Sequence, residues 1–212
     1  MRVLSRLRLS GAIVGALVAC GTALALAVPA AAQTSPSQES VVPKVDDQAI
    51  AGSLKAPLAD RVAAQLRLAP GGVKISPNEI SWDDGKVVMV FPQDGETAAP
   101  ASSSAVLDGG VSTQAIQGCP TQYLGADYYC FYEHGNYGGR RLQFKDHPQF
   151  VLFSTYAFNN QASSWVNGGA AYITVYDGDA GNSPVLWGMP AHTQSSLVAA
   201  ANNDRATSFY AN

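Results

Sequence analysis

Two short stretches of the chain have the same form and decide the expected fold: Asn159–Ser164 (NNQASS) and Asn203–Ser208 (NDRATS). Each contains two Asn or Asp residues, two variable residues, a Ser or Thr, and a final Ser. The second stretch begins 44 residues after the first, which is the length of one four-strand supersecondary unit. The sequence therefore predicts two tandem copies of one β motif.

The segment 118–212 around these stretches is rich in aromatic residues and reads as a packed all-β domain. Eight short strands separated by turn residues, without a long helix, are typical of a sandwich or barrel. The expected strands are Tyr128–Glu133, Arg140–Lys145, Phe150–Thr155, Ser163–Val166, Ala171–Tyr176, Pro184–Trp187, Leu197–Ala201 and Ala206–Tyr210.

The segment 33–96 before this domain has a different character. Apolar residues at helical spacing predict a helix over Leu54–Leu68, and two strand-like runs around Asp83–Gly85 predict a hairpin over Glu79–Phe91. One helix and one hairpin are too small to bury a core of their own. The segment therefore either leans on another part of the protein or is a pro-region removed after export. Residues 97–117, rich in Ala, Ser and Gly, are the expected linker.

The N-terminus has the pattern of a secretory signal peptide over residues 1–32. A basic stretch, Met1–Ser10, precedes an apolar run, Gly11–Val28, and small residues at Ala30 and Ala32 suit cleavage after Ala32. We expect a secreted protein that does not stay in the membrane after cleavage. The alternatives are an uncleaved membrane anchor, or a lipoprotein anchored at Cys20 within the lipobox-like sequence LVAC.

Charge and cysteine content narrow the possible partners. Removing the signal takes away three Arg and no acid, which leaves 10 basic against 16 acidic residues and argues against nucleic acid as a partner. The mature chain keeps Cys119 and Cys130, an even pair in an oxidising compartment, so we expect one disulfide. Two free thiols or a metal site are the alternatives. The chain contains no His-Glu-x-x-His, no Gly-x-Ser-x-Gly and no phosphate-binding loop, so we expect no enzyme.

The doubled motif, together with the aromatic hairpin Tyr132–Gly139 (YEHGNYGG), resembles the two-Greek-key βγ-crystallin fold. In microbial members the doubled motif binds calcium, an ion that takes six to eight oxygen ligands. The resemblance implies possible Ca²⁺ ligands at Glu133 (through a carbonyl), Asn159, Asn160, Ser163, Asn203, Asp204 and Thr207. The alternative is that these side chains only cap turns and tie loops to strands.

Further matches between Cys119 and Tyr210 make the domain similar to the crystallin-fold metalloproteinase inhibitor family of secreted actinobacterial proteins. These matches include Cys130–Tyr132, Tyr137–Gly139 and Val175–Tyr176. The resemblance implies a secreted metallopeptidase as partner and an inhibitory loop within Asp177–Leu186. The residues assigned to that loop are Asp177, Gly178, Asp179, Ala180, Gly181, Asn182, Ser183 and Pro184.

This loop differs from that of the characterised inhibitors, which stiffen the region with a second disulfide. It has no cysteine and contains two glycines, Gly178 and Gly181. Ordering a free backbone costs about 1–2 kcal/mol per residue, so the sequence predicts weak or temporary inhibition with slow cleavage of the loop.

Overall fold

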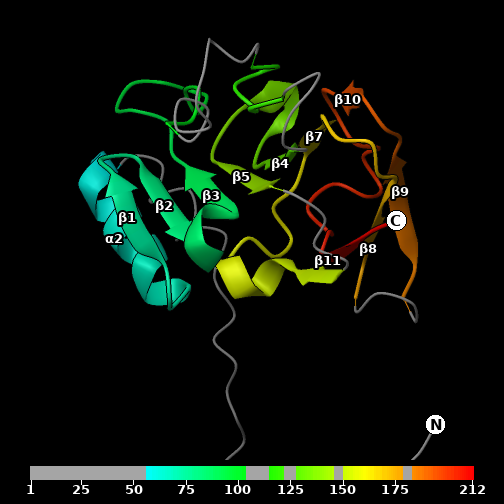
Figure 1. Cartoon of the computed structure of the whole chain (residues 1–212), viewed down its shortest axis with the longest axis horizontal. Helices are drawn as coiled ribbons and strands as arrows, with labels where there is room; N and C mark the ends of the chain where they lie inside the picture. The colour runs from blue at the N-terminus through cyan, green and yellow to red at the C-terminus, as the bar shows by residue number, and fades with distance from the viewer. Residues whose placement is uncertain (1–55, 104–114, 122–127, 146–149, 179–182) are drawn as a thin grey trace, which may run out of the picture. The chain divides into compact units, whose positions relative to one another are not determined.

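The computed structural model describes residues 56–103, 115–121, 128–145, 150–178 and 183–212 (Figure 1). The predicted signal peptide with Cys20 lies outside the described residues. None of the helices in the described part of the chain has the length and apolar character needed to cross a bilayer.

Two antiparallel sheets make up most of the structure, which confirms the predicted all-β fold class. The larger sheet has seven strands in the order β1 (Val73–Ser76), β2 (Glu79–Trp82), β3 (Val87–Val90), β5 (Arg141–Lys145), β4 (Tyr128–Tyr132), β7 (Ser164–Asn167) and β10 (Thr193–Ser195). The smaller sheet has four strands in the order β6 (Phe150–Leu152), β11 (Ser208–Ala211), β8 (Ile173–Tyr176) and β9 (Val185–Met189). One helix, α2 (Leu58–Leu68), and three 3₁₀ turns, η1 (Asp83–Gly85), η2 (Gly135–Tyr137) and η3 (Phe153–Tyr156), complete the described elements.

The two four-strand repeats exchange their third strands. The first repeat is β4 to β7, and its third strand, β6, pairs with β11 of the second repeat. The second repeat is β8 to β11, and its third strand, β10, pairs with β7 of the first repeat. This reciprocal exchange relates the two halves and ties the sheets together (Figure 1).

Most of the expected strands are present, and two differences concern sheet edges. The strand predicted at Leu197–Ala201 is wrong, because the edge strand of this region is the polar segment β10, paired with β7. Leu197 is instead 65% exposed in the connection that follows. Edge strands are commonly short and polar, so a search for apolar alternation misses them. The edge strand β1 was missed as well, with Val73 and Ile75 exposed.

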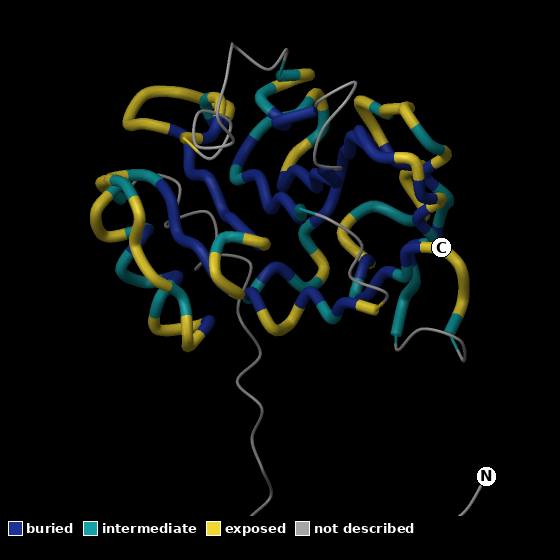
Figure 2. The backbone as a smooth tube through the Cα atoms, viewed as in Figure 1, coloured by how far each residue is buried: buried dark blue, intermediate teal, exposed yellow. Residues whose placement is uncertain are grey.

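Aromatic side chains from both sheets meet in one core. Phe131 of β4 and Phe144 of β5 contact Phe209 of β11, with ring centroids 5.1 and 4.9 Å apart. Phe153 of η3 lies 4.9 Å from Phe131, edge to face. Burying such rings supplies most of the stability of a domain of this size. Figure 2 shows the buried inner strands in dark blue and the exposed turns in yellow.

Residues 56–103, which we call the N-terminal layer, are built into the larger sheet. Strand β3 pairs with β5 at four positions from Val87↔Phe144 to Val90↔Arg141. Side chains of the layer, Val62, Ile80 and Trp82 among them, lie in the same core cluster as Phe144 and Phe209. The helix and hairpin that the sequence predicts therefore lean on β5.

Arg140 joins this layer to the first repeat. Its guanidinium donates to both carboxylate oxygens of Glu133, at 2.8 and 3.1 Å, and to Gln65 Oε1 of helix α2 at 2.6 Å. The Gln65 side chain is almost fully buried and also donates to the carbonyl of Tyr156 at 2.6 Å. Burial alone would raise the pKa of the Glu133 carboxyl, but the charge and hydrogen bonds of Arg140 lower this pKa below its ordinary value.

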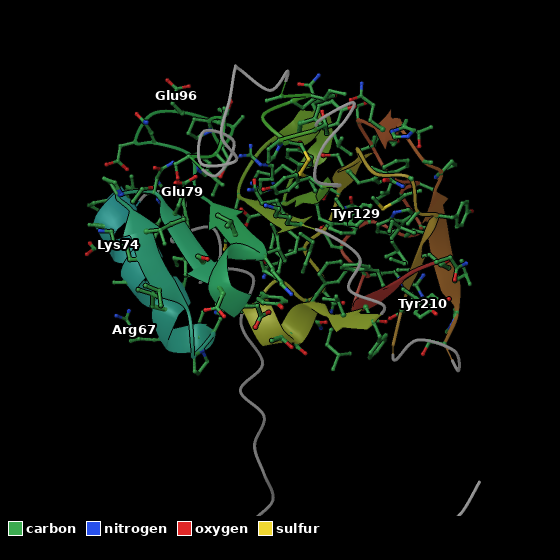
Figure 3. The ribbon with its side chains drawn as sticks, viewed as in Figure 1. Arg67, Lys74, Glu79, Glu96, Tyr129 and Tyr210 are labelled. Carbon is green, nitrogen blue, oxygen red and sulfur yellow. A yellow bond between two sulfur atoms is a disulfide. The ribbon has the colours of Figure 1, made fainter. Side chains whose placement is uncertain are left out.

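Two segments of chain cover the outer face of the larger sheet: one contains Ala99 and Pro100, and the other contains Cys119. Arg141, fully buried on this face, donates to the carbonyls of Ala99 and Pro100, at 3.3 and 2.8 Å. Cys119 and Cys130 form a disulfide, as the sequence predicts, and both are fully buried. Figure 3 shows it as a yellow bond, with Glu79 and Tyr129 labelled on the same sheet.

The disulfide gives a first prediction. The secreted protein should have an intact mass two hydrogens below that of the reduced chain. Replacing both cysteines, Cys119→Ala with Cys130→Ala, should lower the free energy of unfolding by about 2–3 kcal/mol, because the bond closes a loop with a separation of 11 residues. Urea unfolding measures this change. Two thiols that react with iodoacetamide in the native protein would contradict the assignment.

The Glu133–Arg140 pair gives a second prediction. Because the folded pKa of Glu133 is lowered, the pair contributes stability above the ordinary value of 4.5, and this contribution is lost as pH falls through the folded pKa. Glu133→Gln leaves the largely buried Arg140 without its counter-charge and should cost about 3–5 kcal/mol at neutral pH. Urea unfolding between pH 3 and 7 should then show a shallower pH dependence for the variant.

The matched control for this second prediction is Glu96→Gln, since Glu96 is exposed on a loop of the N-terminal layer. It should follow the wild-type curve. If Glu133→Gln lost stability with acid as steeply as the wild type, the pair would not be the source of the effect.

Candidate functional site

The two Asn/Asp-to-Ser motifs occupy equivalent positions in the two repeats. The backbone N–H of Ser163 donates to the carbonyl of Tyr132, and that of Thr207 donates to the carbonyl of Tyr176, each at 2.9 Å. The final serines repeat the pattern. Ser164 Oγ donates to the carbonyl of His134 at 2.7 Å, and Ser208 Oγ to that of Gly178 at 2.5 Å. The 44-residue spacing in the sequence thus corresponds to a repeated hydrogen-bond scheme.

The second motif also contacts the first repeat. Asn160 and Asp204 both adopt left-handed backbone conformations, with φ of 56° and 55°, which Asn and Asp tolerate better than most residues. Asp204 reaches back to the first repeat, where its Oδ1 accepts from Ser163 Oγ at 3.1 Å. Asp204 of the second motif therefore belongs to a cluster of oxygen atoms in the first repeat.

The first cluster of oxygen atoms consists of the Glu133 carbonyl, Ser163 Oγ and the Asp204 carboxylate. Ser163 Oγ lies 3.0 Å from the carbonyl and 3.1 Å from Asp204 Oδ1. Asn203 donates its amide to Asp204 Oδ2 at 2.6 Å, and its own Oδ1 is buried with no hydrogen-bond partner among the described residues. An unpartnered buried oxygen beside a carboxylate suits a hard cation.

These donors fit Ca²⁺ in kind, and their charge is low. The Glu133 carboxylate is held by Arg140, so only its carbonyl belongs to the cluster. Within the described residues no group of three or more His, Cys, Asp or Glu side chains comes together. Among the other residues that the sequence assigns to calcium, Asn159 is half-buried and Asn160 is exposed, while Thr207 lies in the second repeat. One carboxylate implies modest affinity.

In the second repeat the equivalent atoms hold the base of the β8–β9 connection. The Thr207 hydroxyl lies within hydrogen-bonding distance of both the carbonyl and the N–H of Gly178, with the carbonyl at 2.9 Å. Arg205 donates to Asp177 Oδ2 through Nη2 at 2.6 Å and through Nε at 3.2 Å. The N–H of Asp177 donates across the base to the carbonyl of Pro184 at 3.0 Å.

Gly178 is required where it stands. Its φ is +118°, and a Cβ built there would lie 2.4 Å from Ser183 Oγ, so a larger residue would clash and strain the backbone. The glycine that the sequence marks as a source of flexibility is therefore held by hydrogen bonds with Thr207 and Ser208. The predicted loop residues Asp179, Ala180, Gly181 and Asn182 lie outside the described residues.

Sequence reasoning missed Arg205 as a partner of this loop. It occupies a variable position of the second motif, equivalent to Gln161 of the first, so the motif itself carried no signal for it. The 44-residue offset between the repeats does provide a signal. It makes Asp177 the equivalent of Glu133, and each of these acids has an arginine partner. Beyond the loop, Val185 at the start of β9 is 60% exposed at the edge of the smaller sheet.

Comparison with known proteins connects this geometry to a family. The model of peptidase inhibitor family I36 matches residues 113–187. No curated protein matches the sequence.

Solved structures of βγ-crystallin type are similar to this chain at low identity. One, solved in relation to the evolution of the eye lens βγ-crystallin domain fold, is 21% identical, covers 49% of this chain and 93% of that chain, and has a TM-score of 0.37. The βγ-crystallin of Ciona intestinalis is 14% identical, covers 40% and 99%, and has a TM-score of 0.33. A βγ-crystallin domain from Clostridium beijerinckii is 23% identical, covers 39% and 94%, and has a TM-score of 0.33.

The family match spans both cysteines, the aromatic hairpin, the first motif and the β8–β9 connection, and it leaves the N-terminal layer outside. The similarity to peptidase inhibitor family I36 therefore covers residues 113–187, from the segment before the disulfide to strand β9.

Proposed function

We propose that this protein inhibits an extracellular metallopeptidase and that residues 177–186, the β8–β9 connection and the first two residues of β9, enter the peptidase. The observation that carries the proposal is the closed base of this connection in a domain of an inhibitor family. The signal-like N-terminus supports action outside the cell.

A loop that stays bound to a peptidase, and is not released as a cleaved product, must keep its conformation after binding. Rigidity lowers the entropy lost on binding, and preorganisation of a loop therefore improves affinity. In this chain hydrogen bonds and one ion pair hold the two ends of the connection, with Arg205, Thr207 and Ser208 all supplied by the second motif. A non-covalent base of this kind supports inhibition and leaves the segment open to slow cleavage.

The direct test is a titration of a thermolysin-like metallopeptidase with the secreted protein. The wild type should inhibit, and replacing residues 178–184 with Gly and Ser should raise the inhibition constant by about thirtyfold or more, because the residues of an interface hot spot contribute about 2 kcal/mol or more. Unchanged inhibition by that variant would place the contact elsewhere on the protein.

A sharper variant is Arg205→Ala, which leaves the connection itself intact. An exposed ion pair contributes up to about 1 kcal/mol, so its loss should weaken inhibition by about twofold to fivefold. Peptide mapping after incubation with the peptidase should show faster cleavage within 177–186. The matched control is Arg67→Ala, an exposed arginine at the end of α2, which should behave as the wild type. Equal effects of both substitutions would rule out a specific role for the base.

A second function, calcium binding by the first oxygen cluster, is favoured by the unpartnered Asn203 Oδ1 beside Asp204. A bound ion would take the carbonyl of Glu133, the hydroxyl of Ser163 and the Asp204 carboxylate as ligands. It would link the two repeats, since these ligands come from both.

Millimolar CaCl₂ should raise the melting temperature measured by calorimetry. At tenfold excess over Kd the gain is about 1.4 kcal/mol, or about 3–6 °C for a chain of this size. Asp204→Asn should abolish the shift, whereas Asp60→Asn, on the exposed first turn of α2, should keep it. A wild type without any shift would leave these side chains with a purely structural role.

A further inference from the structure

The first repeat and the second repeat differ in what covers their second strands. Strand β5 is flanked on its outer side by β3 of the N-terminal layer, whereas its equivalent, β9, ends the smaller sheet. Without the layer, β5 would expose a row of unpaired N–H and C=O groups. With the layer, four register pairs from β3 satisfy this edge, and the N–H of Lys145 donates to the carbonyl of Lys86 at 2.7 Å.

Polar contacts fix the layer at two further points. Gln65, 2% exposed, accepts from Arg140 and donates to the carbonyl of Tyr156, both at 2.6 Å. The Tyr156 hydroxyl donates to Asp83 Oδ2 of η1 at 3.0 Å. Loss of the layer would leave part of the Arg140 guanidinium and a main-chain carbonyl without these partners, which is costly for buried groups.

The layer also contacts both faces of the larger sheet. On the inner face Trp82 packs edge to face on Tyr156, with centroids 5.5 Å apart, and Met89 is fully buried in the shared core. On the outer face the carbonyls of Ala99 and Pro100 accept from Arg141. The N-terminal layer thus contacts the edge of β5 and both faces of the sheet, as an integral part of a sheet does. It does so although it lies outside the family match.

We propose that the N-terminal layer, residues 56–103, is a permanent partner of the inhibitor-family domain, and that it remains bound without a covalent link when the chain is cut between 104 and 114. The β5 edge and the Arg140 side chain form the surface that binds it. A cut in this region therefore gives a two-chain protein in which the N-terminal layer is retained. The inference is independent of peptidase inhibition.

The experiment uses the full secreted chain with a recognition sequence for a specific protease in place of residues 106–110. After cleavage, size-exclusion chromatography at about 10 μM, above the dissociation constants of typical stable interfaces, should recover both pieces in one peak. In 6 M guanidinium chloride the pieces should separate. Elution of the short piece by itself in native buffer, with the long piece still folded by circular dichroism, would overturn the proposal.

Two variants of the cleavable chain locate the binding contact. Gln65→Ala removes both interlocking hydrogen bonds and should release the short piece about tenfold faster or more after cleavage. Lys74→Ala, on the exposed edge strand β1, should leave release unchanged. Circular dichroism of each uncut variant checks folding. Equal release rates for a folded Gln65→Ala and the wild type would refute the assigned contact, and the wild-type cleavage result decides the proposal regardless of either variant.

Discussion

The pairing of the Arg140 guanidinium is the interaction on which most of this structure depends. The Arg140 side chain is only 16% exposed, so its charge has to be paired. Three residues contact the guanidinium. Glu133 binds it from the aromatic hairpin, Gln65 from the N-terminal layer and Gln161 from the first motif. The rings of Phe91 and Phe158 lie 6.0 and 5.8 Å from it and complete its surroundings. One side chain therefore sets the position of three segments that are distant in sequence.

The two repeats place the same kind of ion pair in different surroundings. Glu133 and Asp177 occupy equivalent positions, and each is paired with an arginine. In the first repeat the pair is largely buried, and its arginine also donates to Gln65 of the N-terminal layer. In the second the pair is exposed, with 48% and 33% of the side chains accessible, and it closes the base of the β8–β9 connection. One supersecondary pattern thus gives a first half joined to the N-terminal layer and a second half whose ion pair lies at the base of the β8–β9 connection.

This division bears on how the ends of the β8–β9 connection are held without a second disulfide. Covalent closure fixes a loop during folding, and hydrogen bonds can do the same as long as the surrounding strands hold their donors in place. Thr207 and Ser208 are held because β11 is the second strand of the smaller sheet, paired on both sides. The contacts that hold the two ends of the connection, at Gly178 and Pro184, therefore depend on the sheet. The exposed Arg205 adds a smaller contribution that salt would screen.

The sequence by itself determined the local patterns. The doubled motif with its 44-residue spacing predicted two related β units, and the cysteine pair predicted the disulfide. Helix α2 and the β2–β3 hairpin were visible because apolar periodicity and the Asp-Asp-Gly turn act over a few residues.

Only the tertiary structure decided where these pieces go. The pairing of Met89 with Leu142, the burial of Gln65 against Arg140 and the assignment of β10 to a sheet edge join residues far apart in the chain, and edge strands such as β1 carry little apolar signal. The fixed conformation of Gly178 follows from side chains of β11 and its flanking turn, 29 and 30 residues away. A glycine in a sequence indicates conformational freedom, whereas the contacts that remove this freedom exist only once the second motif is folded against it.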